Sequence, residues 1–141
     1  MTQSHTPHGP GFRFLDDFTV REGEGIGVWF LAPDLWFFRD HVPGNPLVPA
    51  ALLMEFAAQT AGALWMSTAG GDRPTPLFVA SLDAMRIQGA AFPGETLTAN
   101  TKLVRELGPL AQFEFEITSA SKIVSRGRIT LSRQLAGAPA N

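Results

Sequence analysis

The sequence contains no cysteine among its 141 residues. This absence excludes a disulfide framework, a thiolate zinc site and a cysteine nucleophile. Basic residues are not in excess either, since 11 lysines and arginines stand against 13 aspartates and glutamates, for a formal net charge of −2. Nucleic-acid binding needs a concentrated basic face, so this balance argues against a nucleic-acid partner.

Targeting and membrane signals are also lacking. The N-terminal residues MTQSHTPHGPG have neither a basic region nor an apolar run, so they do not form a secretory signal peptide. Residues 47–69 are long and apolar, but Glu55 and Gln59 interrupt them and no basic flank anchors them. We therefore expect a helix buried in the core of a soluble, cytoplasmic protein that does not associate with a membrane.

What the chain does have is enough apolar sequence for one domain, with 45% hydrophobic residues. We expect a flexible N-terminal tail at 1–11, a single domain at 12–134 and a flexible C-terminal tail at 135–141. His5 and His8 fall in the first tail without partner ligands, so we expect no metal site there.

Periodicity predicts the elements of this domain. Two strands, 12–21 and 26–32, are expected around a Glu-Gly-Glu-Gly hairpin turn, followed by one helical turn in 35–40 and a long helix from Pro49 to Thr68. After residue 77 the pattern alternates between apolar and polar residues, which predicts about four antiparallel strands. One sheet and one long apolar helix indicate an α+β fold in which a curved antiparallel sheet wraps around the helix.

The segment between the aromatic turn and the long helix carries the candidate chemistry. It reads HVPGNPLVPAALLMEFAAQ from His41 to Gln59, with Glu55 placed 14 residues after His41. This segment resembles the signature of the β-hydroxyacyl-(acyl carrier protein) dehydratases, which are hotdog-fold enzymes of fatty acid synthesis. FPGE at 92–95 and FRFLDD at 12–17 resemble further family segments, so the likeness covers roughly residues 12–133.

The resemblance implies a role for each motif residue. His41 would be the general base that removes the C2 proton of a 3-hydroxyacyl thioester, with its ring oriented by the carbonyl of Leu47. Glu55, from the partner subunit, would be the acid that protonates the departing hydroxyl, favoured in its neutral form by apolar surroundings. The N–H of Ala50, which stands where the family has glycine, would hold the thioester oxygen. Gln59 would fix the Glu55 carboxyl group, and Gly44 would help to shape the loop.

The family also implies a setting for these residues. No metal and no diffusible cofactor is needed, because the substrate is carried on the phosphopantetheine of the acyl carrier protein or of CoA. The expected assembly is a homodimer, or a higher oligomer, with active sites at the interface. Trp36, Phe37 and Phe38 are candidates for the wall of the acyl tunnel, and Arg126, Arg128 and Lys122 for a docking patch that meets the acidic carrier protein.

Two alternatives remain open at the level of sequence. One is a hotdog acyl thioesterase, in which a carboxylate acts on water and no histidine is required. The other is a non-catalytic hotdog subunit that supports a catalytic one in a heterodimeric dehydratase. Ala50 and Asp40, which stand where the family commonly has glycine, motivate this second alternative.

Overall fold

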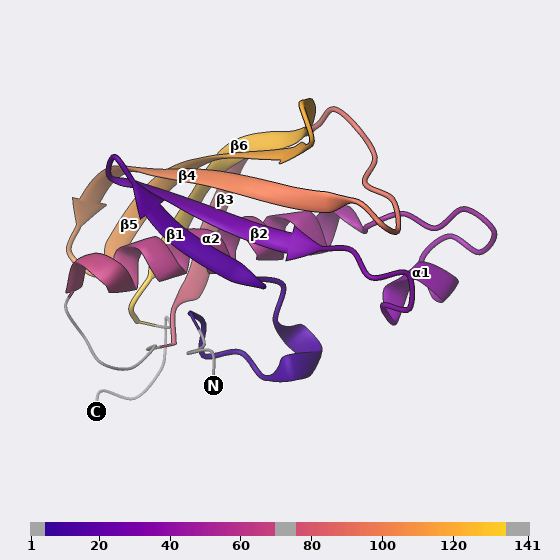
Figure 1. Cartoon of the computed structure of the whole chain (residues 1–141). Coiled ribbons are helices and arrows are strands. Elements are labelled where there is room, and N and C mark those ends of the chain that lie inside the picture. The colour runs from indigo at the N-terminus through magenta and orange to yellow at the C-terminus, as the bar shows by residue number, and fades with distance from the viewer. Residues whose placement is uncertain (1–4, 70–75, 135–141) are drawn as a thin grey trace.

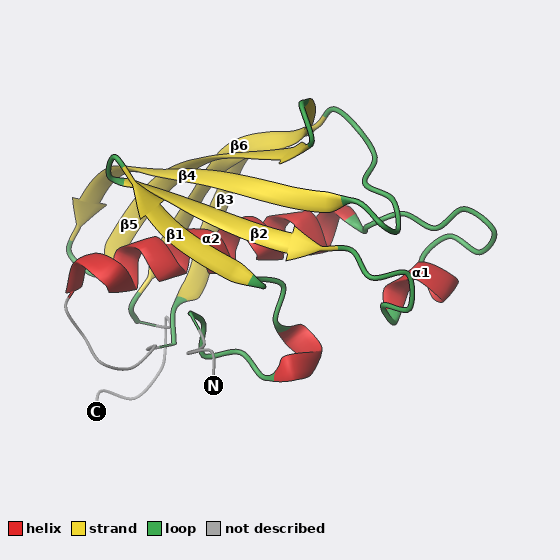
Figure 2. Cartoon of the chain, in the orientation of Figure 1, coloured by secondary structure: helices red, strands yellow, loops and turns green. Residues whose placement is uncertain are grey.

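The computed structural model describes residues 5–69 and 76–134 as one sheet with one long helix (Figures 1 and 2). The expected C-terminal tail lies outside the described residues. The elements in chain order are η1 (Pro10–Phe12), β1 (Asp17–Arg21), β2 (Glu24–Phe30), α1 (Phe37–Asp40), α2 (Ala50–Ala69), β3 (Phe78–Ile87), β4 (Thr96–Leu107), β5 (Leu110–Ser119) and β6 (Lys122–Ser132).

The six strands form one antiparallel sheet in the order β1-β2-β4-β5-β6-β3. Helix α2 lies along one face of this sheet, which curves over it in Figure 1, and packs against β1, β2, β4, β5 and β6. Side chains on this face alternate with solvent-facing ones, so Phe113, Phe115 and Ile117 of β5 are buried while Glu114 is exposed. This arrangement is the predicted α+β layout.

The largest differences from the predicted boundaries lie in the first two strands, where β2 spans Glu24–Phe30 instead of residues 26–32. Residues 10–12 form a 3₁₀ turn beginning at Pro10, and Phe14 and Leu15 pack into the core, so β1 begins at Asp17 rather than at residue 12. The hairpin turn is also shorter than expected. Glu22 and Gly23 both have positive φ, 53° and 80°, which is the conformation of a two-residue type I′ turn that matches the twist of the strands.

The extent of the domain stays a prediction. Of the expected N-terminal tail, residues 5–11 belong to the described part of the chain, and Thr6 is buried there. Within the described residues, no helix is long and apolar enough to cross a membrane.

Candidate active site

The loop between α1 and α2 is held at both ends and turns sharply in its middle. The N–H of Asn45 donates to the carbonyl of Val42 at 2.9 Å, which closes a turn around Pro43 and Gly44. Gly44 has a φ of 81°, as the third residue of a type II turn requires. Further along, the N–H of Val48 donates to the carbonyl of Ala91 at 2.9 Å, so the loop is tied to the segment before β4.

His41 stands at the start of this loop, directly after α1. Its backbone N–H donates to the carbonyl of Phe37 at 3.0 Å, and its ring Nδ1 lies 3.2 Å from the carbonyl oxygen of Leu47. A carbonyl only accepts hydrogen bonds, so this contact requires a proton on Nδ1 and leaves the lone pair of a neutral ring on Nε2. His41 is an exposed residue in this chain. The neighbouring Asp40 carboxylate pairs with Arg39, at 3.2 Å, instead of with His41.

Ala50 is the first residue of α2, where backbone N–H groups lack helical partners. In the described part of the chain its N–H donates to no other group, whereas the N–H of Leu52 donates to the carbonyl of Pro49. Ala50 is not among the residues with positive φ, so an alanine fits this position without backbone strain. The replacement of the family's glycine therefore leaves the N–H in place.

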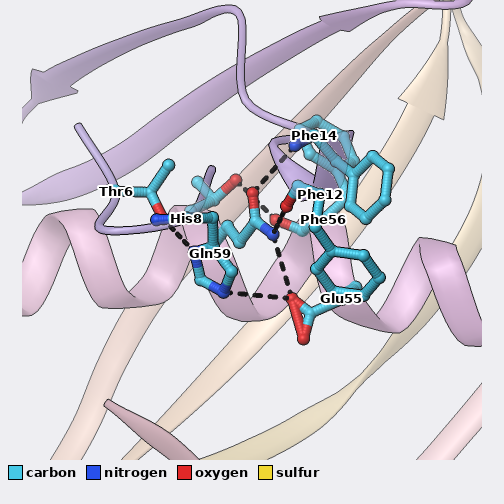
Figure 3. A network of polar contacts seen from close by, with 8 residues as sticks. Thr6, His8, Phe12, Phe14, Glu55, Phe56 and Gln59 are labelled. Carbon is cyan, nitrogen blue, oxygen red and sulfur yellow. Dashed lines mark hydrogen bonds and ion pairs between the residues drawn. The ribbon is translucent and has the colours of Figure 1, made fainter. Parts of the chain in front are cut away.

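Glu55 and Gln59 lie one turn apart on α2 and contact each other (Figure 3). The amide Nε2 of Gln59 donates to Oε2 of Glu55 at 3.1 Å and to the carbonyl of Phe12 at 3.0 Å, while its Oε1 accepts from the N–H of Phe14 at 2.9 Å. Gln59 is 3% exposed, so these three bonds fix its orientation. The Glu55 side chain keeps 19% of its surface accessible, which leaves the carboxyl group reachable from outside.

His8 is a residue near this carboxyl group that the sequence did not single out. Its Nε2 lies 4.0 Å from Oε2 of Glu55, and its Nδ1 hydrogen-bonds with the hydroxyl of Thr6 (Figure 3). No local pattern signals this contact, because 47 residues separate the two side chains and only the path of the chain before β1 brings them together.

A pocket of about 370 Å³ opens beside Glu55. The N-terminal segment with His8 lines one side, Met54, Glu55 and Ala58 of α2 line another, and residues around Phe78 complete it. Trp36, Phe37 and Phe38 do not line this pocket. Phe37 and Phe38 are instead buried against the core beside Trp29, and Trp36 is exposed, so their tunnel role stays a prediction.

The three cations of the expected docking patch all have local partners. Arg126 pairs with Glu116 at 2.7 Å and Arg128 lies 3.8 Å from Glu114, each directly across from it on β5. Lys122 donates to the carbonyl of Ala90 at 2.7 Å and lies 3.8 Å from Glu95. These pairings reduce the net positive charge of the patch, and carrier-protein docking there stays a prediction.

His41 and Glu55 form no hydrogen bond or ion pair with each other within the described part of this single chain. His41 lies before α2, and Glu55 lies on the second turn of α2. The carbonyl of Leu47 contacts the His41 ring, and the amide of Gln59 donates to the Glu55 carboxyl group. In residues 5–69 and 76–134, no group of three or more His, Asp or Glu side chains is arranged to hold a metal ion.

The curved sheet around one helix, the imidazole on a Pro-Gly loop and the carboxyl group on the helix together define the hotdog class of acyl-thioester proteins. Within that class, the chain belongs to the ApeI-like dehydratase family, whose model, described as ApeI dehydratase, matches residues 20–128. This match covers most of the sheet and the whole of α2, including His41, Ala50, Glu55 and Gln59.

A sequence relative supports this membership, and two solved structures share the fold. The 3-hydroxyacyl-(acyl-carrier-protein) dehydratase FabZ of Lactococcus lactis subsp. cremoris is 32% identical over 127 residues, which cover 89% of this chain and 88% of the relative. Among solved structures, the dehydratase heterocomplex ApeI:P from Xenorhabdus doucetiae shares the fold with a TM-score of 0.78 at 17% identity, covering 94% of this chain and 90% of that one. The PaaI protein of the E. coli phenylacetic acid degradation operon aligns with a TM-score of 0.64 at 16% identity, covering 84% and 79%.

Proposed function

We propose that the protein is a hydro-lyase that removes water from (3R)-hydroxyacyl thioesters and releases trans-2-enoyl thioesters. The observation that carries the proposal is the contact of His41 Nδ1 with the carbonyl of Leu47, from which we infer a neutral ring with its lone pair on Nε2. This observation occurs on a chain of the ApeI-like dehydratase family. The acyl carrier protein is the proposed substrate carrier, as in the name of the Lactococcus relative. The reaction is proposed to need no cofactor and to take place in the cytoplasm.

The proposed mechanism assigns one step to each group. Nε2 of His41 takes the proton from C2, and negative charge builds on the thioester oxygen as this C–H bond breaks. The N–H of Ala50 donates to that oxygen, and the positive end of α2 adds to its stabilisation. The carboxyl group of Glu55, held by Gln59, gives its proton to the C3 hydroxyl, which leaves as water.

His41 and Glu55 are proposed to meet across a homodimer, with the base of one subunit facing the acid of the other. The absence of a direct contact between them in the single described chain supports this assignment. The solved ApeI:P structure from Xenorhabdus doucetiae is a dehydratase heterocomplex. It suggests a second candidate assembly, in which this chain works with a different hotdog subunit. A homodimer that is active alone favours the first candidate, and a protein that is inactive until a second hotdog protein is added favours the other.

The proposal is tested with a panel of 3-hydroxyacyl thioesters and an assay for the enoyl product. His41→Ala and Glu55→Gln are each expected to lower kcat by roughly 100-fold or more, because each removes a directly acting base or acid. Ala50→Pro, at the first helical position where proline is tolerated, removes the N–H, and we expect a loss of roughly 100-fold.

Ala50→Gly is the matched control, because it keeps the N–H, and it should retain activity close to that of the wild type. The melting temperatures of the variants should stay near the wild-type value. Release of free acid and thiol, instead of enoyl thioester, would identify a thioesterase. Water release that is unaffected by His41→Ala would contradict the proposal.

A further inference from the structure

We infer that His8 is a positioning residue that returns a proton to Glu55 between turnovers, and that Thr6 holds its imidazole in the tautomer this transfer needs. The inference rests on the proposed dehydration, because it explains how the acid is restored after each reaction. His8 lies outside the dehydratase motif and comes from the segment before β1.

The geometry brings an imidazole to the one carboxyl group of the site. Nε2 of His8 lies 4.0 Å from Oε2 of Glu55, on the side where Gln59 also donates (Figure 3). Each oxygen of a carboxylate has two acceptor positions, so Oε2 can accept from Gln59 and still receive a proton from His8, through one bridging water or after the ring moves closer than 4.0 Å. The His8 side chain is 30% exposed, so it contacts both the solvent and the buried edge of the site.

Thr6 selects the tautomer of this ring. The Thr6 hydroxyl accepts from the backbone N–H of His8 at 3.4 Å, and it contacts Nδ1 of the same residue. With Nδ1–H donating to the hydroxyl oxygen, the ring keeps its Nδ1 proton throughout, and Nε2, the nitrogen nearest to Glu55, is the one that gains and loses a proton. Thr6 is 3% exposed, so this arrangement is held by packing.

The proposed dehydration requires a group that returns a proton to Glu55 after each turnover. In one turnover the C2–H bond breaks and its proton goes to His41, while the C3–O bond breaks and the hydroxyl leaves as water with the proton from Glu55. His41 is then protonated and Glu55 is a carboxylate, so a proton must leave the first and another must reach the second. A His8 imidazolium gives the Nε2 proton to the Glu55 carboxylate and then takes a new proton from solvent.

The surroundings of His8 contain few other charged groups. Glu55 faces it from α2, and the guanidinium of Arg13 donates to its backbone carbonyl at 2.9 Å from the chain that follows η1. The ring of Phe12 lies 6.1 Å away, centroid to centroid, and carries no charge. Gln59 is the nearest polar neighbour of Glu55, but an amide does not exchange protons near neutral pH. Histidine does, so His8 is the group suited to this step.

The test measures kcat for wild type and for His8→Ala, in buffers with and without added imidazole. We expect His8→Ala to lower kcat roughly tenfold, less than the ~100-fold typical of a directly acting acid or base. Added imidazole should restore the lost rate in a saturable manner, because its protonated form can deliver the proton that the missing ring supplied. Thr6→Val, which keeps the shape and removes the hydroxyl, should give a smaller loss. His5→Ala is the matched control, since the His5 ring lies against Phe18, and it should match wild type.

Three outcomes would overturn the inference. If the wild type is active and the His8→Ala protein is equally active, the inference about His8 is wrong and the proposed function is unaffected. A loss of rate that imidazole does not restore, together with a lowered melting temperature, assigns His8 a purely structural role. A wild-type protein that releases no water from any thioester of the panel overturns the proposed function, and this inference falls with it.

Discussion

Glu95 shows how a single residue can join three parts of this fold. Its Oε1 accepts from the N–H of Phe92 at 2.8 Å, its Oε2 accepts from the hydroxyl of Ser119, and Lys122 lies 3.8 Å away. Burial, the largest single influence, raises the pKa of Glu95, but the bonds from Ser119 and Phe92 and the charge of Lys122 together lower that pKa below its ordinary value of 4.5. The carboxylate is therefore the favoured form in the folded protein.

Glu95→Gln should destabilise the protein near neutral pH by about 1 kcal/mol, the size of a hydrogen bond to a partly buried group. A carboxyl group with a lowered folded pKa adds stability above its ordinary pKa, and this stability is lost as the pH falls through the folded pKa. The difference between wild type and variant should thus be full at pH 7 and should shrink below about pH 4.

Urea unfolding at a series of pH values measures this difference. Glu106→Gln is the control, because Glu106 is exposed on β4 and has no ion-pair partner in the described part of the chain. The free energy of unfolding of this variant should equal that of the wild type at every pH. If the loss of unfolding free energy in Glu95→Gln is the same at pH 7 and pH 3, the ionised carboxylate of Glu95 is not the source of that stability.

At the scale of elements, the packing of α2 on β2 depends on glycine. A Cβ built on Gly27 would lie 2.2 Å from the Thr60 hydroxyl and 2.7 Å from a methyl group of Leu15. The Thr60 hydroxyl already donates to the carbonyl of Phe56 inside the helix at 2.9 Å, so it cannot easily turn away. The helix can therefore lie this close to the strand only where the strand has no side chain.

Gly27→Ala should lower the free energy of unfolding by roughly 1–3 kcal/mol, the usual cost of overpacking a core. Gly11→Ala is the matched control, because a Cβ there meets nothing within 4 Å and the residue does not have positive φ. Chemical denaturation of the two variants beside wild type tests the pair. Equal stability of all three proteins would mean that α2 does not rest against β2 as closely as the structure has it.

The elements were predictable from the sequence because their signals are local. The apolar run after Pro49 predicts α2 within one residue at each end, and alternation predicts β4 and β5, since burial on one face repeats every second residue. The contact of His41 with Leu47 was expected from the family motif, because both residues lie in one short loop. The contact of His8 with Glu55 was not predictable, because no pattern in a short polar segment indicates which distant helix it will meet.

At the scale of the whole molecule, strand β3 leaves one end of the sheet incomplete. Val79 and Leu82 lie opposite Leu131 and Ile129 of β6, whose side chains are buried on the face that α2 covers. Val79 and Leu82 are nevertheless each 40% exposed, so this single chain leaves both side chains partly uncovered. An edge strand with free backbone groups and apolar side chains is suited to pair with a second copy of the sheet.

Leu82→Lys should therefore convert the proposed dimer to a monomer, because it places a charge in the apolar contact across β3. Light scattering after size-exclusion chromatography measures the mass, and the dehydration assay should show a loss of at least about tenfold if His41 of one subunit must meet Glu55 of the other. Val20→Lys is the matched control, since Val20 is 49% exposed on β1 at the opposite edge of the sheet, and it should leave mass and activity unchanged. A monomeric Leu82→Lys protein with full activity would show that one chain holds a complete site, and His8, the imidazole nearest to Glu55 within that chain, would then become the candidate base.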